Sequence, residues 1–229
     1  MIGTVCPVSA ERHGDGPVRQ YAGEFEIHLT VRLETGEGEE VPLRVWAERH
    51  GFKYTHIVLD RGRTPDQPML TCHGRGNLAG QLATARQWVE RLRGDGFRVA
   101  RVKIEAAPWN TDVPKTDAEA GTLPEGLYFE HHVKLLLSGE AEVASVRALA
   151  VPYAAHVSRN ARRDLAAGRH ERFVTQRCRG VGRDEAGRRL RALLRALDDA
   201  GHAAVEVERE FVVHDDNPAV DDGWMGSLE

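Results

Sequence analysis

The clearest pattern in the chain is an alternation of apolar and polar residues from Glu24 to Leu33. Successive side chains of a strand point to opposite faces, so the alternation predicts a strand with one buried face and one polar face. The apolar face carries Phe25, Ile27, Leu29, Val31 and Leu33, and the polar face carries Glu26, His28, Thr30 and Arg32.

Strand and helix patterns follow one another in the same order twice. The first series predicts a strand at 24–33, a helix at 42–50, strands at 54–60 and 69–73, a helix at 78–93 and a strand at 97–106. The second series predicts a strand at 127–137, a helix at 140–149, strands at 154–160 and 171–179, a helix at 184–200 and a strand at 203–214. Each is a β-α-β-β-α-β unit, the ferredoxin-like arrangement with both helices on one face of the sheet.

Residue identities repeat between the two series as well. The matched pairs are Phe25 and Phe129, Glu26 and Glu130, His28 and His132, Thr71 and Thr175, Glu105 and Glu210, and, with a shorter offset, His56 and His156. We therefore expect an α+β fold made by tandem duplication, with pseudo-twofold symmetry. The two sheets would lie side by side or form a closed or half-closed barrel.

The repeats also predict the boundaries along the chain. We expect an irregular N-terminal segment at 1–20, a first repeat at 21–107, a linker at 108–124, a second repeat at 125–217 and an irregular tail at 218–229. The length of 229 residues fits one large domain or two intimate ones.

Composition narrows the class of protein. With 41% hydrophobic and 29% charged residues the chain can bury a core, and its net charge of −4 gives no general attraction to nucleic acid or anionic membranes. Three cysteines without a CxxC motif argue against a disulfide scaffold and a cysteine-rich zinc site. No apolar run reaches the ~18 residues of a membrane span, and no secretory signal is apparent, so a cytoplasmic location is expected.

Charge is unevenly distributed along the second half. Twelve arginines and four carboxylates lie between residues 159 and 195, whereas from Glu206 onward the carboxylates face only Arg209. One interpretation is that the two stretches neutralise each other. The other is that some of the arginines bind phosphate or carboxylate, for which the planar guanidinium is suited.

The polar faces of the strands carry the candidate catalytic groups. If these faces meet, His28, His132, His56 and His156 converge, with Glu26 and Glu130 beside them. Imidazole titrates near neutrality, with a reference pKa of about 6.5, which suits acid–base chemistry. The candidate ligand-binding residues are Arg32, Lys134, Thr30, Ser158, His73, Arg177 and Arg179.

Less specific interpretations apply to the same residues. The polar faces could simply meet water, and strand histidines are often structural. A divalent metal ion held by these histidines is not favoured, because no HxH or HExxH spacing is present. We therefore assign no metal ligands, and leave the cofactor and the oligomeric state unassigned.

Two short motifs are similar to those of known families. His28-Leu29-Thr30 and His156-Val157-Ser158 resemble the HxT and HxS pair of two-histidine phosphoesterases, although here they fall on non-equivalent strands. The segment from Glu130 to Lys134 resembles the ExExK strand of triphosphate tunnel enzymes, with His132 in place of a glutamate. These departures keep the chain from being assigned to either family.

The leading hypothesis is an enzyme, phosphoesterase- or phosphohydrolase-like, that acts on a phosphorylated or other anionic small molecule such as a nucleotide. Histidine acid–base chemistry would take place in the cleft between the repeats. One alternative is a non-catalytic module that binds an anionic ligand or regulates a partner. Another is an accessory that contacts RNA or protein through the arginine-rich surface at 159–195, although nucleic acid is not the favoured partner.

Overall fold

The computed structural model describes residues 19–33, 40–161 and 170–225, and every helix and strand predicted from the sequence is present in it. The first half contains β1 (Gly23–Arg32), α1 (Glu40–His50), β2 (Lys53–Leu59), β3 (Asp66–Gly76), α2 (Leu78–Gly94) and β4 (Arg98–Ala106). The second half contains β5 (Tyr128–Leu137), α4 (Glu140–Ala150), the 3₁₀ turn η1 (Val151–Tyr153), β6 (Ala155–Asn160), β7 (His170–Arg179), α5 (Arg183–Asp199) and β8 (Glu206–Asp215).

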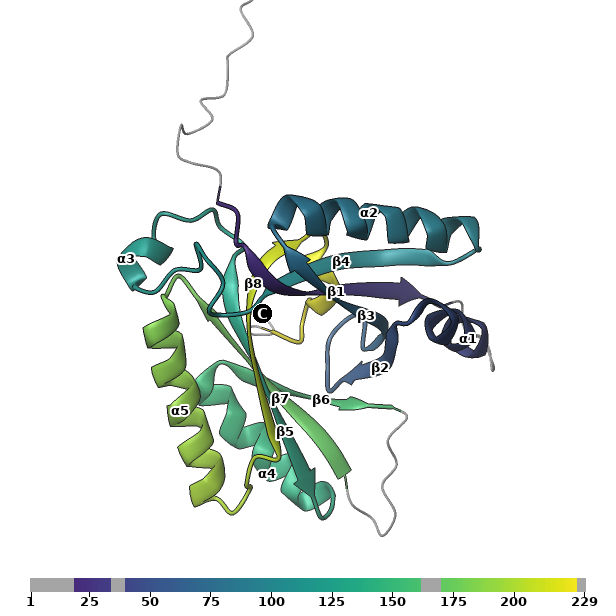
Figure 1. Ribbon diagram of the computed structural model, residues 1–229. Helices are drawn as coiled ribbons and strands as arrows, with labels where there is room; N and C mark the ends of the chain where they lie inside the picture. The colour runs from purple at the N-terminus through teal and green to yellow at the C-terminus, as the bar shows by residue number, and fades with distance from the viewer. Residues whose placement is uncertain (1–18, 34–39, 162–169, 226–229) are drawn as a thin grey trace, which may run out of the picture.

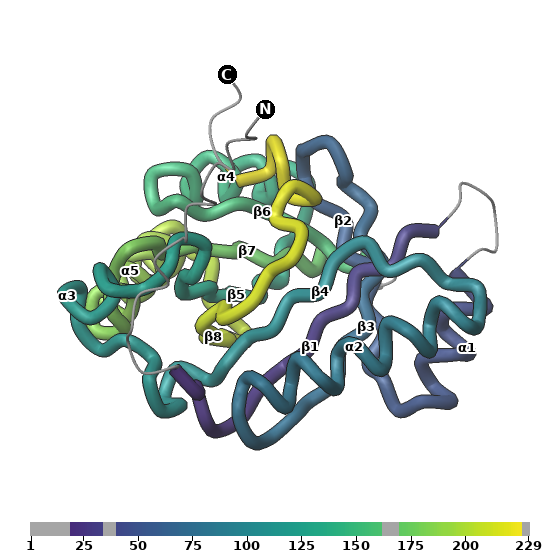
Figure 2. The backbone as a smooth tube through the Cα atoms, turned by 90° about the horizontal axis from the view of Figure 1, so that it is seen from above, coloured from purple at the N-terminus to yellow at the C-terminus, as the bar shows by residue number. Residues whose placement is uncertain are grey.

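The eight strands form one antiparallel sheet that closes on itself (Figures 1 and 2). The first half has the strand order β4-β1-β3-β2, and the second half has the matching order β8-β5-β7-β6. Pairing of β2 with β6 and of β4 with β8 joins the halves into a ring. The fold is therefore a mixed α+β arrangement around an eight-stranded antiparallel sheet.

The four long helices lie outside the sheet, with α1 and α2 over the first half and α4 and α5 over the second (Figure 1). They cover the apolar strand faces, as the alternation in β1 predicts. Phe25, Ile27 and Leu29 are at most 3% exposed. Burying an apolar side chain of this size contributes about 1.5–3 kcal/mol relative to leaving it in water. The polar faces of the strands are thereby left to line the interior of the ring.

The strand register aligns polar side chains across each half. The His28 row consists of Lys53, Thr71, His28 and Lys103, which are neighbours across β2, β3, β1 and β4. The His132 row consists of His156, Thr175, His132 and Glu208, which are neighbours across β6, β7, β5 and β8. The two rows occupy the same positions in the two halves, with threonine and histidine at the centre of each.

Both the predicted linker and the tail predicted to be irregular contain local structure. The segment that connects the halves includes α3 (Asp117–Ala120), which begins with a capping box between Thr116 and Glu119. It packs against the start of α5 so closely that a Cβ atom at Gly182 would lie 2.4 Å from the carbonyl carbon of Thr116. The tail contains the 3₁₀ turn η3 (Pro218–Asp221) and the buried Trp224. The N-terminal segment at 1–18 lies outside the described residues.

Candidate functional site

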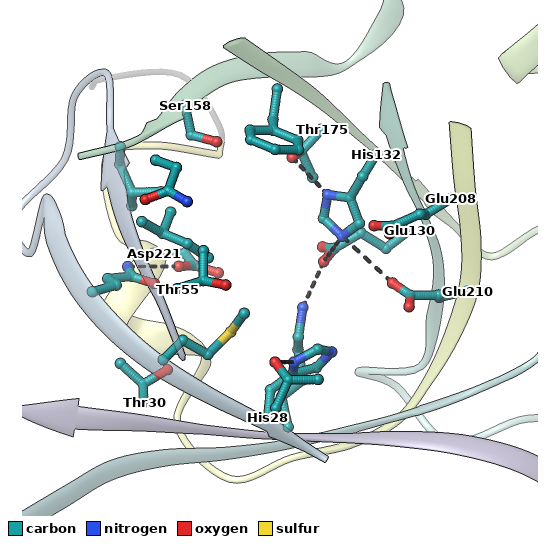
Figure 3. A pocket seen from close by; sticks show the side chains of 18 of the residues that line it. His28, Thr30, Thr55, Glu130, His132, Ser158, Thr175, Glu208, Glu210 and Asp221 are labelled. Atoms are coloured by element: carbon teal, nitrogen blue, oxygen red, sulfur yellow. Dashed lines mark hydrogen bonds and ion pairs between the residues drawn. The ribbon is translucent and has the colours of Figure 1, made fainter. Parts of the chain in front are cut away.

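The interior of the closed sheet contains a cavity of about 370 Å³. All eight strands contribute lining residues, and Asp221 and Trp224 of the tail close part of it (Figure 3). The side chains that point into it are mostly polar because they belong to the strand faces that the helices do not cover. A cavity of this size can hold a small molecule.

Two histidines at the cavity wall have matching surroundings. Nδ1 of His28 lies 2.9 Å from the Thr71 hydroxyl, and its Nε2 lies 2.5 Å from a carboxylate oxygen of Glu105. Nδ1 of His132 lies 3.0 Å from the Thr175 hydroxyl. In each row the threonine fixes the orientation of the ring, so that Nε2 faces carboxylates from the neighbouring strands.

The carboxylates around His132 are more distant from its ring. Nε2 of His132 lies 3.3 Å from Glu130 and 3.5 Å from Glu210. The His132 side chain is 22% exposed, whereas that of His28 is 9% exposed. His132 is therefore the more accessible of the two imidazoles to a molecule in the cavity.

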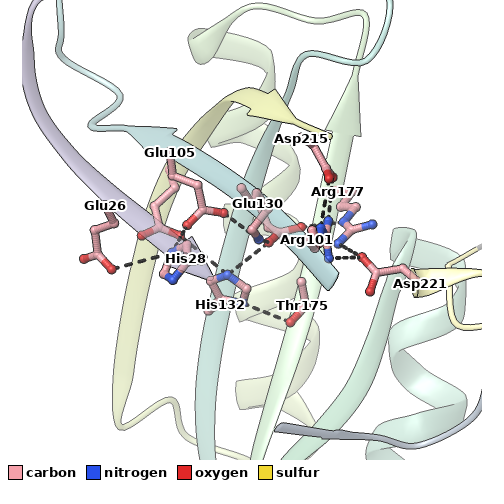
Figure 4. Close-up of polar contacts among 12 residues, drawn as sticks. Glu26, His28, Arg101, Glu105, Glu130, His132, Thr175, Arg177, Asp215 and Asp221 are labelled. Atoms are coloured by element: carbon pink, nitrogen blue, oxygen red, sulfur yellow. Dashed lines mark hydrogen bonds and ion pairs between the residues drawn. The ribbon is translucent and has the colours of Figure 1, made fainter. Parts of the chain in front are cut away.

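A network of buried ion pairs runs from this centre toward the tail (Figure 4). Lys103 Nζ lies 2.7 Å from Glu105 and 2.6 Å from Glu130. Arg177 contacts Glu130 as well, and lies 2.6 Å from Asp221. Arg101 bridges Asp221 at 3.0 Å and Asp215 at 2.5 Å. These cations are engaged by carboxylates of the protein itself, which limits their role in holding a ligand.

The network separates the pKa values of neighbouring carboxyl groups. Burial alone would raise the pKa of Glu105, but Lys103 and His28 outweigh it and hold that pKa below its usual range. Burial and the adjacent Glu105 carboxylate raise the pKa of Glu210 well above its usual range. Burial would lower the pKa of His132, but Glu130 outweighs it, so the pKa is raised. Groups that hold their proton and groups that have lost it thus lie side by side in one centre.

A groove of about 620 Å³ reaches the same centre from outside. Glu26, Glu208 and Glu210 line both the groove and the inner cavity, so they form the boundary between the two. The exposed Trp109 stands at the groove, with 63% of its surface accessible. The groove gives the centre a path to solvent.

Eight of the thirteen site residues predicted from the sequence line the inner cavity: Glu26, His28, Thr30, Glu130, His132, Lys134, Ser158 and Arg177. The other five do not. Arg32 is exposed at the end of β1, and Arg179 stacks over the Tyr128 ring at 4.2 Å. His73 lines the outer groove, with its side chain 75% exposed.

His56 and His156 are the other two residues outside the cavity. His56 lies on the opposite face of β2, where it contacts Glu40 at 2.9 Å and Asp66 at 3.3 Å. The residues of β2 that line the cavity are Lys53, Thr55, Ile57 and Leu59. The predicted match of His56 with His156 is wrong, because Lys53 occupies the position across from Thr71 that His156 occupies across from Thr175. His56 is three positions from Lys53 along β2, and side chains an odd number of positions apart point to opposite faces of a strand.

His156 lies on the same strand face as Thr175 but is not among the residues that line the cavity. Its ring packs 6.3 Å from that of Trp224, and Arg61 donates a hydrogen bond of 3.1 Å to its Nδ1. Burial, reinforced by the charges of Arg61 and Arg177, lowers the pKa of His156 to about 4. This imidazole is therefore neutral near pH 7.

Several residues of the centre were not predicted from the sequence. They are Arg101, Lys103 and Glu105 on β4, Glu208 and Glu210 on β8, and Asp221 in the tail. Both strands show polar residues at alternating positions, which is the signal that could have identified them. Mutual neutralisation of the arginine-rich and acidic stretches is seen in the pair of Arg177 with Asp221.

Comparisons with known proteins add little to this description. No family model matches the chain, and no curated protein matches its sequence. Among solved structures it is similar to a mutant chlorite dismutase from Candidatus Nitrospira defluvii, with 11% identity over 84% of this chain and 92% of that chain and a TM-score of 0.30. It is also similar to the small subunit of acetolactate synthase from Thermotoga maritima, with 13% identity over 83% of this chain and 94% of that chain and a TM-score of 0.28. At such scores the similarity carries no argument about activity.

The helices offer no candidate for a membrane span. Within the described residues, none combines the length and the apolar composition that crossing a bilayer requires.

Proposed function

We propose that the protein is an enzyme that transfers protons to and from a small molecule bound in the inner cavity. The observation that carries the proposal is the pair of histidines, His28 and His132, each oriented by a threonine at Nδ1 and facing carboxylates at Nε2. A positioned imidazole beside carboxyl groups with separated pKa values suits general acid–base catalysis. The repeated strand order supports tandem duplication as the origin of the pair.

The substrate class follows from the cations that the protein leaves unengaged. Lys134 and Arg177, predicted to hold an anion, pair with Glu206 and with Glu130 and Asp221. Lys53 also lines the cavity and forms no ion pair with another described residue, whereas Arg159, which pairs with Val58, belongs to the outer strand face. We propose that Lys53 holds an anionic group, such as a phosphate, on the substrate. Lys53 is suited to this role because it lies next to Thr71 in the His28 row.

The proposal is tested with a panel of sugar phosphates, nucleoside monophosphates and phosphodiesters. Thermal-shift measurements identify ligands that bind the native state, and NMR of the same mixtures detects turnover. We expect the double variant His28→Gln/His132→Gln to lose turnover by about 10²–10⁴-fold, the usual contribution of a general acid or base. Unchanged turnover in this variant would rule out the proposed chemistry.

His56→Gln provides the matched control. It removes a strand histidine that contacts carboxylates, but from the outer face of β2. We expect this variant to keep the turnover of the wild type. Equal losses in the control and in the double variant would indicate a general effect of histidine removal on the fold.

A second candidate function is contact with a macromolecule through α5. Arg188, Arg189, Arg191 and Arg195 are exposed on this helix, which lies outside the sheet and away from the cavity (Figure 1). Binding of RNA to such a surface depends steeply on salt concentration. Fluorescence anisotropy with single-stranded RNA at two salt concentrations tests it, and salt-independent or undetectable binding would contradict it.

A further inference from the structure

Two carboxylates at the boundary of the inner cavity have no cationic partner of their own. No lysine or arginine of the described residues forms an ion pair with Glu26 or Glu210. Their partners are imidazoles: Glu26 lies 3.7 Å from His28 and 3.5 Å from His73, and Glu210 lies 3.5 Å from His132. The other buried carboxylates of the centre, Glu105 and Glu130, are compensated by Lys103.

Glu26 and Glu210 converge with His28 in a geometry that suits a metal ion. One ligand atom each from Glu26, His28 and Glu210 lies within 4.8 Å of the other two. Ligands about 2.0–2.2 Å from one ion lie about 3–3.6 Å from each other, so a small closure of these side chains completes a site. The hydroxyl of Thr71 at Nδ1 of His28 supplies the outer contact that orients a metal-binding imidazole.

A second set of three residues competes less well for the ion. Glu105, His132 and Glu210 also lie within 4.8 Å of one another. However, Glu105 already contacts Lys103 at 2.7 Å and His28 at 2.5 Å. An ion there would meet the positive charge of the lysine, whereas Glu26 and Glu210 form no ion pair with a lysine or arginine of the described residues. The outer groove reaches Glu26 and Glu210 and gives such an ion an entry path.

We propose that Glu26, His28 and Glu210 bind one divalent transition-metal ion, of the class of Mn²⁺, Fe²⁺, Co²⁺ or Zn²⁺. One imidazole and two carboxylates form the mixed nitrogen and oxygen ligand set that these ions accept. Binding through Nε2 replaces the contact of His28 with Glu105, and Lys103 continues to compensate Glu105. The site deepens the proposed function and rests on it for its role, because His28 becomes a ligand and His132 remains for proton transfer.

The site is tested by isothermal titration of chelator-treated protein with Mn²⁺, Co²⁺ and Zn²⁺, with Mg²⁺ as the comparison ion. We expect one transition-metal ion per chain, a rise in Tm with metal concentration, and weaker binding of Mg²⁺ because it prefers oxygen ligands. Glu26→Gln, His28→Gln and Glu210→Gln should each weaken binding by more than about 100-fold. Thr71→Val should weaken it by about 10–100-fold, as loss of an outer contact does.

Glu208→Gln provides the matched control, because Glu208 lines the same boundary but is not a member of either ligand set. We expect it to change the affinity less than about threefold, and circular dichroism establishes that each variant is folded. The site is refuted if the wild type binds none of the three ions. It is refuted equally if Glu208→Gln weakens binding as much as Glu210→Gln, which would indicate diffuse charge attraction.

His132→Gln separates this inference from the proposed function. We expect the variant to keep the wild-type affinity for Co²⁺ and to lose turnover. If turnover persists while the metal site behaves as described, the proton-transfer role of His132 is wrong and the site stands. If Glu26→Gln binds Co²⁺ as the wild type does, the site is wrong and the proposed function is unaffected.

Discussion

The His28 row and the His132 row contain the same pair of central residues between different end residues. Threonine and histidine occupy the centre of both, whereas the ends are Lys53 and Lys103 in the first row and His156 and Glu208 in the second. The first row is thus flanked by positive charge, and the second by a neutral imidazole and a carboxylate. The comparison suggests that the shared centre performs one function, while the flanks give the two halves different electrostatic roles.

The strands that bear these flanks differ along their whole inner faces. β4 carries Arg101, Lys103 and Glu105, and β8 carries Glu206, Glu208 and Glu210 at the corresponding positions. Two basic residues of one strand therefore correspond to two acidic residues of the other. The buried cations compensate acids near β4, whereas Glu208 and Glu210 on β8 form no ion pair with a lysine or arginine of the described residues, and Glu210 belongs to the proposed metal site.

The largest effect on stability is expected from replacing Lys103, the buried cation of the His28 row. Among the described residues, Lys103→Met leaves the buried Glu105 with His28 as its ion-pair partner, and Glu130 with Arg177 and His132. Breaking a buried ion pair from one side costs about 3–5 kcal/mol, so we expect the free energy of unfolding to fall by that amount. Denaturant unfolding monitored by circular dichroism measures it.

Glu208→Gln is the corresponding change in the His132 row. Glu208 is exposed and forms no ion pair with another residue that the structure describes, so its replacement should change the free energy of unfolding by less than about 0.5 kcal/mol. Similar losses in the two variants would contradict the unequal roles of the row ends. Partial recovery in Lys103→Met/Glu105→Gln would establish the uncompensated carboxylate as the cause.

A smaller loss is expected from the next position along the third strands. Arg177 on β7 corresponds to His73 on β3, and the two differ in burial: the Arg177 side chain is 8% exposed and that of His73 is 75% exposed. Arg177→Met should lower the free energy of unfolding by about 1.5–3 kcal/mol, the range for hydrogen bonds to charged groups. The loss is smaller than for Lys103→Met because Glu130 keeps Lys103, and Asp221 keeps Arg101.

His73→Gln serves as the reference for Arg177→Met in the same unfolding experiment. Because the His73 side chain is exposed, this change should alter the free energy of unfolding by less than about 0.5 kcal/mol. If Arg177→Met is no more destabilising than His73→Gln, the ion pairs of Arg177 with Glu130 and Asp221 do not stabilise the fold.

The sequence predicts the centre of each row but not the ends. The inward position of His28 follows from clean alternation in β1, and that of His132 follows from the apolar Phe129, Val133 and Leu135 of β5, with which His131 shares a face. In β2, the residues from Tyr54 to Val58 do not alternate, so nothing local determines the face of His56. That face depends on the pairing of β2 with β3, which is decided by the register of the whole hairpin.

Contacts that span the chain were beyond prediction for a different reason. Asp221 lies in a segment without periodicity, yet it accepts hydrogen bonds from Arg101 and Gln67 in the first half and from Arg177 in the second. Glu105 and Glu210 were recognised as a repeated pair, but their positions beside His28 and His132 depend on the antiparallel pairing of β4 with β1 and of β8 with β5. Local patterns identify the strands, whereas the long-range pairing assembles the site.

The smallest effect is expected at His156, which occupies the place of Lys53 in the second row. Its pKa is lowered to about 4 by burial and by Arg61 and Arg177, against about 6.5 in the unfolded chain. Between these values the unfolded state binds more protons, so this residue's contribution to stability is complete above about pH 6.5 and declines toward pH 4. His156→Gln, which keeps a polar side chain for Arg61, should therefore flatten the dependence of unfolding free energy on pH within that window. Parallel pH profiles for wild type and variant, or an NMR titration of His156 near pH 6.5, would show that the folded protein does not keep the His156 imidazole neutral.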